Sequence, residues 1–219
     1  MLMRKLFSCL IFACFVLTLS SQQIYLKTGK VFSSFDYQNS EGNSLSDLEG
    51  AFLNNLGIGA RTPVFKSPCN ISFEISNDRF AASSSDTLLG NYSEWDVSFL
   101  DLNLGVDYEF LRPLYNRNDP EGFSFCLKAI FATDFLIKGK QRLNNQVFDL
   151  TGVEEFDKPV FLVKGGACIN YYITRSYVAF AQYLYGRSFL IGNYSGQEQL
   201  RYTTHSISIG FAINLLIND

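Results

Sequence analysis

Three carboxylates occupy positions of one parity in the segment 95–110: Asp101, Asp107 and Glu109. Side chains of one parity share a face of a β-strand, so this set could serve acid–base chemistry or hold a cation. Basic residues occupy the matching face of other segments, however, and a charge away from water is stable only when it is paired. We therefore interpret the carboxylates as members of a salt-bridged network in an enclosed lumen. The predicted network consists of Lys27, Arg61, Glu74, Asp101, Asp107, Glu109, Lys128, Asp134 and Lys164.

The only histidine is His205, and it precedes Ser206. A His–Ser pair at a membrane interface would suggest a lipid-modifying enzyme. Consecutive residues of a strand point to opposite faces, so these two side chains cannot act together, and Ser208 shares the face of Ser206. The sequence indicates no other serine or threonine partner. We therefore predict no catalytic residue and keep a lipid-modifying barrel enzyme as a second alternative.

Other chemistry receives little support. One histidine and scattered cysteines do not provide the ligand spacing of a zinc site. Gly57, Gly59, Gly165 and Gly166 could suggest a phosphate-binding loop, but no helix follows them. The net charge is −3, and no basic face is present for nucleic acid. We expect no metal, no cofactor and no nucleic-acid partner.

Cys126 and Cys168 lie on the same predicted face of two consecutive segments, 122–136 and 159–173. If Ile137 pairs near Pro159, the two cysteines come close together. A disulfide is then possible in an oxidising compartment. The interpretation that we favour from the sequence is that both are small free side chains in a tight lumen.

The first 22 residues differ from the rest of the chain. Arg4 and Lys5 precede an almost wholly apolar run, 6–19, and residues 20–22 are small and polar, as in a secretory signal peptide. The run is shorter than the roughly 20 residues of a membrane-spanning helix. We predict a signal peptide over 1–22 and a barrel domain over 23–219.

Eight later segments alternate large apolar with small or polar residues, and none has a helical period. The last is the most regular, because every odd position from Ile207 to Ile217 is large and apolar. The segment 177–188 is ambiguous, because Gln182 interrupts the face of Val178 and Leu184. The segments are 24–37, 52–64, 70–80, 95–110, 122–136, 159–173, 177–188 and 206–218.

The connections between these segments alternate between short and long. In an up-and-down barrel, this places the long loops at one end and the short turns at the other, as in outer-membrane barrels. The last strand must then pair with the first, because a closed sheet leaves it no other partner. The long connections are 38–51, 81–94, 137–158 and 189–202.

The polar face of the segments is rich in Gly, Ser, Ala and Asn. Small residues suit the narrow interior of an eight-stranded barrel. The segments also exceed the roughly 9–11 residues that a tilted strand needs to cross hydrocarbon. We therefore predict an all-β protein, a single eight-stranded antiparallel up-and-down transmembrane barrel with lipid on its apolar face and little or no conductance. The first alternative is a secreted soluble lipocalin-like barrel that binds a ligand.

Three stretches carry a resemblance to a known family: 25–32 (Y-L-K-T-G-K-V-F), 56–59 (L-G-I-G) and 209–211 (I-G-F). With them, the mature chain resembles the small porin-like outer-membrane β-barrel domain family of Gram-negative bacteria. The resemblance implies localisation in the cell outer membrane and a non-enzymatic, structural or porin-like role with four long surface loops. It also implies two partners, outer-membrane lipid and the barrel-assembly machinery. The end of the chain, 216–219, lacks the terminal aromatic residue of many such proteins.

Overall fold

The computed structural model describes residues 23–38, 44–45, 49–64, 67–86, 91–110, 122–143, 146–152, 158–189 and 199–215, and the statements below refer to them. The predicted signal peptide lies outside these ranges and stays a prediction. Within them, no helix is long and apolar enough to cross a membrane. The long strands are β1 (Gln23–Gln38), β4 (Phe52–Pro63), β5 (Cys69–Asp86), β6 (Asn91–Phe110), β7 (Gly122–Leu143), β9 (Val160–Tyr172), β10 (Tyr177–Phe189) and β11 (Gln199–Asn214). The short ones are β2 (Ser44–Leu45), β3 (Glu49–Gly50) and β8 (Gln146–Asp149).

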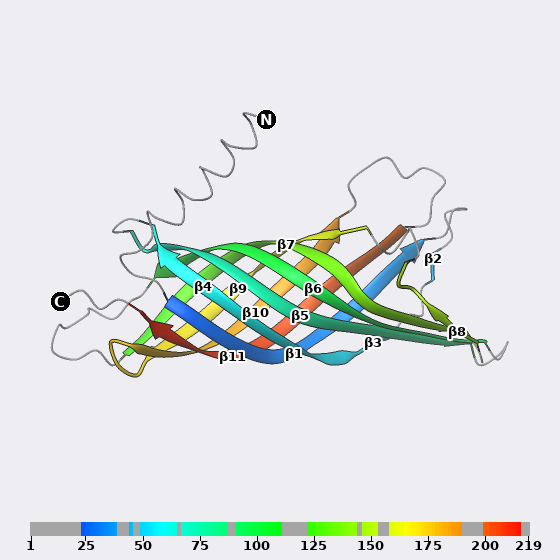
Figure 1. Ribbon diagram of the computed structural model, residues 1–219, viewed down its shortest axis with the longest axis horizontal. Helices are drawn as coiled ribbons and strands as arrows, with labels where there is room; N and C mark the ends of the chain where they lie inside the picture. The colour runs from blue at the N-terminus through cyan, green and yellow to red at the C-terminus, as the bar shows by residue number, and fades with distance from the viewer. Residues whose placement is uncertain are drawn as a thin grey trace, which may run out of the picture.

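The eight long strands form one closed antiparallel sheet (Figure 1). Each pairs with the next along the chain, and β11 pairs with β1 over the whole of both strands. Closure gives every barrel strand two partners, which a membrane requires because it cannot solvate an open sheet edge. The predicted pairing of the last strand with the first is therefore confirmed.

The strands are strongly tilted, as Figure 1 shows. Paired residues can be followed around the sheet from Ile24 through Phe73, Phe131 and Thr203, and the path returns to β1 at Ser34, ten residues beyond its start. Such a stagger in a barrel of eight strands corresponds to a tilt of roughly 35–45°. Residues on one paired row therefore lie at different depths along the barrel axis.

Large apolar residues cover most of the outside of the barrel, and many of the inward side chains are small or polar. On β11, Ile207 and Ile209 are 65% and 62% exposed, whereas Ser208 and Ala212 are almost fully buried. Leu26 on β1 and Leu104 on β6, 55% and 57% exposed, follow the same rule. A soluble lipocalin-like barrel needs the reverse arrangement, so the structure confirms the predicted eight-stranded transmembrane barrel.

Strand β10 corresponds to the ambiguous segment 177–188, and its apolar face points into the lumen and not toward lipid. Its apolar residues Val178, Phe180 and Leu184 point inward with Gln182, and its outward residues are mostly tyrosines and alanines. Val178 and Phe180 pack with Tyr25 inside the barrel near the turn end, the end that holds the chain reversal between β9 and β10. Gln182 interrupts the apolar face because its side chain lies among the polar residues of the lumen, where it accepts a hydrogen bond from Lys128.

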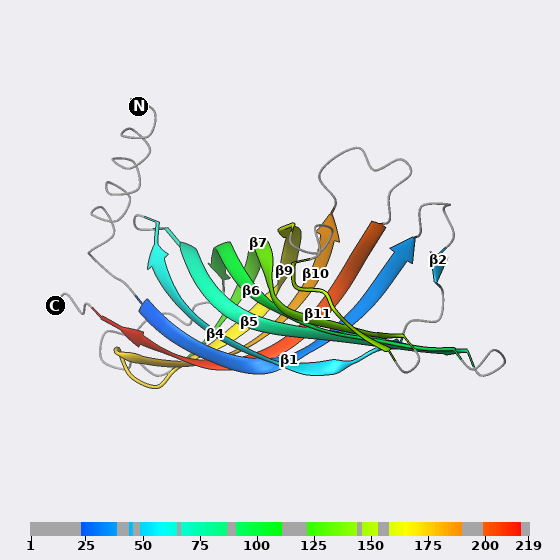
Figure 2. The ribbon, with the colours of Figure 1, turned by 45° about the vertical axis from the view of Figure 1, so that its right-hand side comes forward.

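At the opposite, loop end, strands β5, β6 and β7 continue beyond the barrel (Figure 2). Two of the predicted loops, 81–94 and 137–158, are thus partly strand: β5 pairs with β6 as far as Asp86 and Asn91, and β8 pairs with the end of β7. The residues 81–86 are small or polar and have no apolar alternation. Beside β8, the Thr151 N–H donates to the Asp149 carboxylate at 2.9 Å, which lowers the pKa of Asp149.

Candidate functional site

The interior of the barrel contains the charged residues that the sequence placed in one network. Glu74 on β5 accepts from Lys27 Nζ of β1 at 2.7 Å and from the Tyr25 hydroxyl at 3.1 Å. Gly57 on β4 makes room for this pair, since a Cβ atom there would lie 3.0 Å from Lys27 Cε. Two predicted members thus form a direct, nearly fully buried ion pair.

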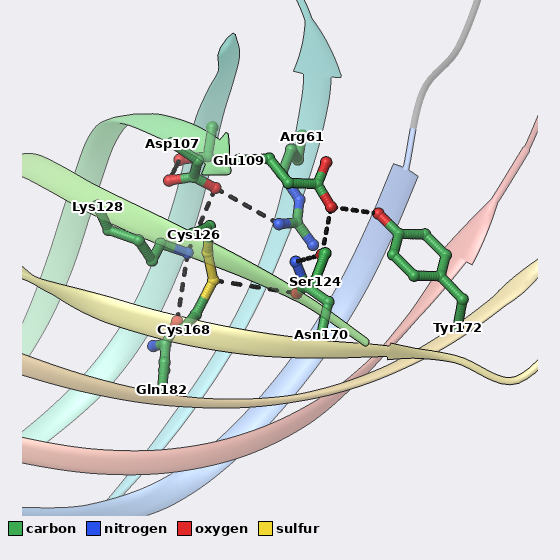
Figure 3. Close-up of a disulfide and its surroundings, with 11 residues drawn as sticks. Arg61, Asp107, Glu109, Ser124, Cys126, Lys128, Cys168, Asn170, Tyr172 and Gln182 are labelled. Carbon is green, nitrogen blue, oxygen red and sulfur yellow. Dashed lines mark hydrogen bonds and ion pairs between the residues drawn. A yellow bond between two sulfur atoms is a disulfide. The ribbon is translucent and has the colours of Figure 1, made fainter. Parts of the chain in front are cut away.

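A second group is centred on Asp107 of β6, whose side chain is fully buried (Figure 3). Arg61 Nη1 and Lys128 Nζ lie 3.6 and 3.4 Å from Asp107 Oδ2. Lys128 also donates to Gln182 Oε1 at 3.2 Å, and both cations lie 5.9 Å from the centre of the Tyr25 ring. The ring face adds a favourable cation–π contact to the ion pairs.

A third group surrounds Lys164 of β9, which forms ion pairs with Asp101 and with Asp78, the latter at 3.5 Å. Asp134 lies directly opposite Asp101 in the sheet, and the Tyr202 hydroxyl donates to Asp134 at 2.5 Å. Asp78 is not among the predicted members of the network, although it has the same parity as Glu74 on the same strand. The even parity of position 78 on β5 would have been enough to predict that the Asp78 side chain points into the lumen.

Glu109 is the predicted member that differs from the others. It is only partly buried, near the turn end of the barrel. It accepts from the hydroxyls of Ser124 and of Tyr172, the latter at 2.7 Å, and Asn170 in turn donates to Ser124 at 3.2 Å (Figure 3). No ion pair to Glu109 occurs among the described residues, so hydroxyl groups stand where the network prediction expected a base.

We call the buried charged residues the ionic layer. Its members are Lys27, Arg61, Glu74, Asp78, Asp101, Asp107, Lys128, Asp134 and Lys164. It contains five acids and four bases, so the charges inside the barrel nearly cancel. Asparagine and serine side chains complete the contacts, as where Asn55 donates to Asp78 at 2.9 Å and Asn103 to Asp101 at 2.9 Å.

A cluster of apolar side chains fills the lumen toward the loop end, and we call it the apolar layer. The rings of Phe80 and Tyr202 lie 5.1 Å apart, and Phe99 packs against both. Leu150, which follows β8, folds back into the cluster, and its N–H bonds to the Gly139 carbonyl at 2.9 Å. The layer consists of Val31, Phe80, Val97, Phe99, Ile130, Ala132, Leu150, Leu162, Leu184 and Tyr202.

Cys126 and Cys168 are joined by a disulfide that faces the lumen (Figure 3). They are direct partners in the pairing of β7 with β9, with Cα atoms 5.0 Å apart. The expected register was wrong by two residues, because Asp134 and not a later residue pairs with Val160. A shift of two keeps every side chain on its face, so the disulfide that the sequence allowed is formed, and the favoured interpretation as two free thiols is wrong. Cys69 is a free cysteine.

His205 lies on the outside of the barrel, among aromatic residues. Its Nδ1 atom is 2.8 Å from the Tyr183 hydroxyl, and its ring lies 5.2 Å from that of Tyr185. Ser206, by contrast, is bonded to the Leu184 carbonyl at 3.4 Å. No His–Ser pair exists here. In the described part of the chain, no group of three or more His, Cys, Asp or Glu side chains is placed to hold a metal ion.

The fold and the interior together define a transmembrane β-barrel of the outer-membrane type with a lumen occupied by side chains. The location in the outer membrane is the one that the sequence predicts. No family model matches the chain, and no curated protein matches it in sequence.

Among solved structures, the chain is similar to Neisserial surface protein A, with a TM-score of 0.49, 10% identity, and coverage of 87% of this chain and 96% of that one. It is also similar to the outer membrane protein OprG from Pseudomonas aeruginosa, with a TM-score of 0.48, 12% identity, and coverage of 90% and 97%. A third is a major outer membrane protein from Thermus thermophilus, with a TM-score of 0.40, 10% identity, and coverage of 87% and 99%.

Proposed function

We propose that this protein is a non-enzymatic barrel of the outer membrane that does not conduct ions and that has a structural role. The observation that carries the proposal is the occupied lumen. Side chains of the ionic layer cross the lumen between strands that are not neighbours, such as β1 and β5 or β9 and β5, and the apolar layer covers them toward the loop end. At the turn end, Tyr25, Val178 and Phe180 form a further apolar cluster.

Each of these features opposes the passage of an ion. Apart from the Tyr202 hydroxyl, which is bonded to Asp134, the side chains of the apolar layer offer no group that could replace the hydration shell of an ion. Movement of an ion past Lys27 and Glu74 requires their separation, and an unpaired buried charge costs about 3–5 kcal/mol. A porin-like conducting role would require both layers to open together.

The extension of β5 to β8 supports a second element of the proposal, contact with another molecule outside the membrane. On β8, Val147 is 57% exposed and Phe148 43% exposed. This strand lies beyond the barrel, so lipid does not account for its apolar side chains, and exposed apolar groups of this kind are found at protein contacts. We propose the extension as the contact surface. The barrel would insert into outer-membrane lipid with the help of the assembly machinery.

Planar-bilayer recording with the purified, refolded protein tests the proposal. We expect no unitary current steps from the wild type, and we expect steps after Phe80→Ala and Tyr202→Ala are combined with Lys27→Met and Glu74→Gln to open both layers. Folding of each protein is checked by its heat-dependent migration in a detergent gel. Regular steps from the folded wild type would contradict a closed lumen. Lipid hydrolysis by the pure protein that His205→Ala abolishes would contradict the non-enzymatic role.

A further inference from the structure

Outward-facing basic residues gather on one side of the barrel, where β10, β11 and β1 are neighbours (Figure 2). Arg187 on β10 and Lys30 on β1 are both exposed and share the outward parity of the apolar residues on their strands. His205 lies on β11, the strand between them. The side chains of these three residues form what we call the basic stripe.

The pairing register places His205 next to both cations. Arg187 is paired with Thr203, and Lys30 is paired with Ile207. His205 is two residues from each of these partners, so it is the diagonal neighbour of Arg187 and of Lys30. Diagonal neighbours in an antiparallel sheet are about 7–8 Å apart, within reach of one extended ligand group.

The stripe runs close to the plane of the membrane. A paired row gains depth from strand to strand, because it returns to β1 ten residues beyond its start. The gain is ten residues over eight strands, so a diagonal that moves back two residues on each strand more than cancels it and drifts slowly toward the turn end. Continued onto β4 and β5, the same diagonal leads from Lys30 to Leu56 and Ile75, which are 56% and 40% exposed. The cations are thus level with apolar wall elsewhere on the barrel.

No acid of the barrel faces these two cations among the described side chains. The direct partners of Arg187 are Val163 and Thr203, and those of Lys30 are Ile207 and Asn54. Their diagonal neighbours are also free of acids. Arg201 is a further exposed cation nearby, but Asp36 lies opposite it in the sheet, and we leave it outside the site. An ionic group at lipid depth requires a partner of opposite charge, and the described part of the barrel does not supply one here.

The geometry points to a binding site on the basic stripe for a membrane lipid with a phosphate headgroup; this inference rests on the proposed membrane location. The guanidinium of Arg187 provides two parallel donors suited to phosphate oxygens, and Lys30 provides a point charge. Tyr183 contacts Nδ1 of His205 at 2.8 Å, so the Nε2 edge of the imidazole is free of that bond and can contact the headgroup. The acyl chains would lie against Ile207 and Ile209.

A lipid matches the site better than free phosphate does, because the stripe adjoins the apolar wall and is reached from within the membrane. A lipid carries both a charged headgroup and hydrocarbon chains. The headgroup can contact the basic stripe while the chains contact the neighbouring apolar residues. The class of ligand is therefore a phosphomonoester or phosphodiester lipid of the leaflet on the loop side.

Native mass spectrometry of the refolded protein in neutral detergent, titrated with phosphatidic acid, tests this site. The test variant combines Lys30→Gln with Arg187→Gln, and the matched control combines Lys138→Gln with Lys140→Gln, two exposed lysines of β7 beyond the barrel. Each cation near an anionic lipid surface contributes about a factor of five, so we expect the test variant to bind about 25-fold more weakly. We expect the control to bind like the wild type. The conservative pair Lys30→Arg with Arg187→Lys should keep most of the affinity.

Equal binding by the test variant and the wild type would overturn the inference, and so would an equal loss in the control, which would show attraction to charge in general. Glycerol phosphate, the headgroup without acyl chains, is the second probe. If it binds as tightly as phosphatidic acid, the site is one for free phosphate and not for lipid. Heat-dependent migration is measured for every variant. A folded barrel that binds no lipid contradicts this inference alone, whereas a protein that forms no barrel in detergent contradicts the proposed function as well.

Discussion

The ionic layer and the apolar layer fill neighbouring parts of the same lumen, and they depend on their members in different ways. In the apolar layer, each side chain contributes through its own volume, so the loss of one leaves a cavity beside otherwise intact contacts. In the ionic layer, Lys164 serves both Asp78 and Asp101, and Asp107 serves both Arg61 and Lys128. The loss of one member there leaves charges without partners. The comparison indicates that ionic residues are coupled and apolar residues are closer to additive.

The largest effect is expected from the centre of the ionic layer. Lys164→Met removes the only base in contact with Asp78 and Asp101 among the described residues. We expect a loss of about 3–5 kcal/mol in the free energy of unfolding, because buried carboxylates remain uncompensated. Urea unfolding in lipid vesicles, followed by heat-dependent migration, measures it. The exposed Lys138→Met is the control, and equal stability of both variants would show that the ionic layer does not hold the barrel.

A smaller loss is expected from the apolar layer. Leu162→Ala removes a fully buried side chain on β9 that stands next to Lys164 in the lumen. Truncation of a buried leucine costs about 2–5 kcal/mol, and we expect about 3 kcal/mol here. Paired with Val31→Ala, the loss should be close to the sum of the two single losses, apart from a few tenths of a kcal/mol. A strongly non-additive result would remove the distinction between the layers.

The coupling in the ionic layer can be measured directly with Lys27→Met and Glu74→Gln. The glutamine keeps an acceptor for the Tyr25 hydroxyl, which lies 3.1 Å from Glu74. Each single variant leaves one charge of this pair buried without its partner, whereas the double variant removes both charges of the pair. We expect the double loss to be about 2 kcal/mol smaller than the sum of the single losses. A double-mutant cycle in the same unfolding assay gives this value, and additivity would mean that the 2.7 Å ion pair contributes no coupling.

The smallest effect is expected outside the membrane. Arg79 and Asp96 form an ion pair at 3.0 Å on the outward face of β5 and β6, with both side chains about half exposed. Exposed pairs contribute about 0.2–1 kcal/mol, and salt screens them. Arg79→Ala should therefore change the unfolding midpoint little and should lose even this effect in high salt. A loss as large as that of Lys164→Met would show that exposure does not separate strong pairs from weak ones in this protein.

The face of each side chain could be predicted from the sequence, because alternation has a period of two and lipid demands an apolar exterior. Lys27, Arg61 and Lys128 lie in the lumen for this reason. The partner of each charge could not be predicted, because partners depend on register and on the closure of the barrel. Asp78 was not predicted as a member, and Glu109 was predicted as one but has no ion pair among the described residues.

The length of the strands could not be predicted from the sequence either. Residues 81–86 contain small and polar side chains with no apolar face, and nothing in them separates a strand in water from a loop. Backbone pairing with β6 extends β5 over them all the same. On β10, Val178 and Leu184 face inward because the lumen itself contains apolar clusters, so apolar alternation alone did not identify the lipid side.

The disulfide between Cys126 and Cys168 has a consequence for a barrel exposed to proteases. The bond spans 42 residues and encloses the whole connection from β7 to β9, including β8 outside the membrane. A cut anywhere in that connection would break the chain but leave its two pieces joined covalently within the barrel wall. The end of β7 and the strand β8 can therefore be cut outside the membrane while the barrel stays one molecule, and the pieces would separate only when a reductant is present and the barrel is unfolded.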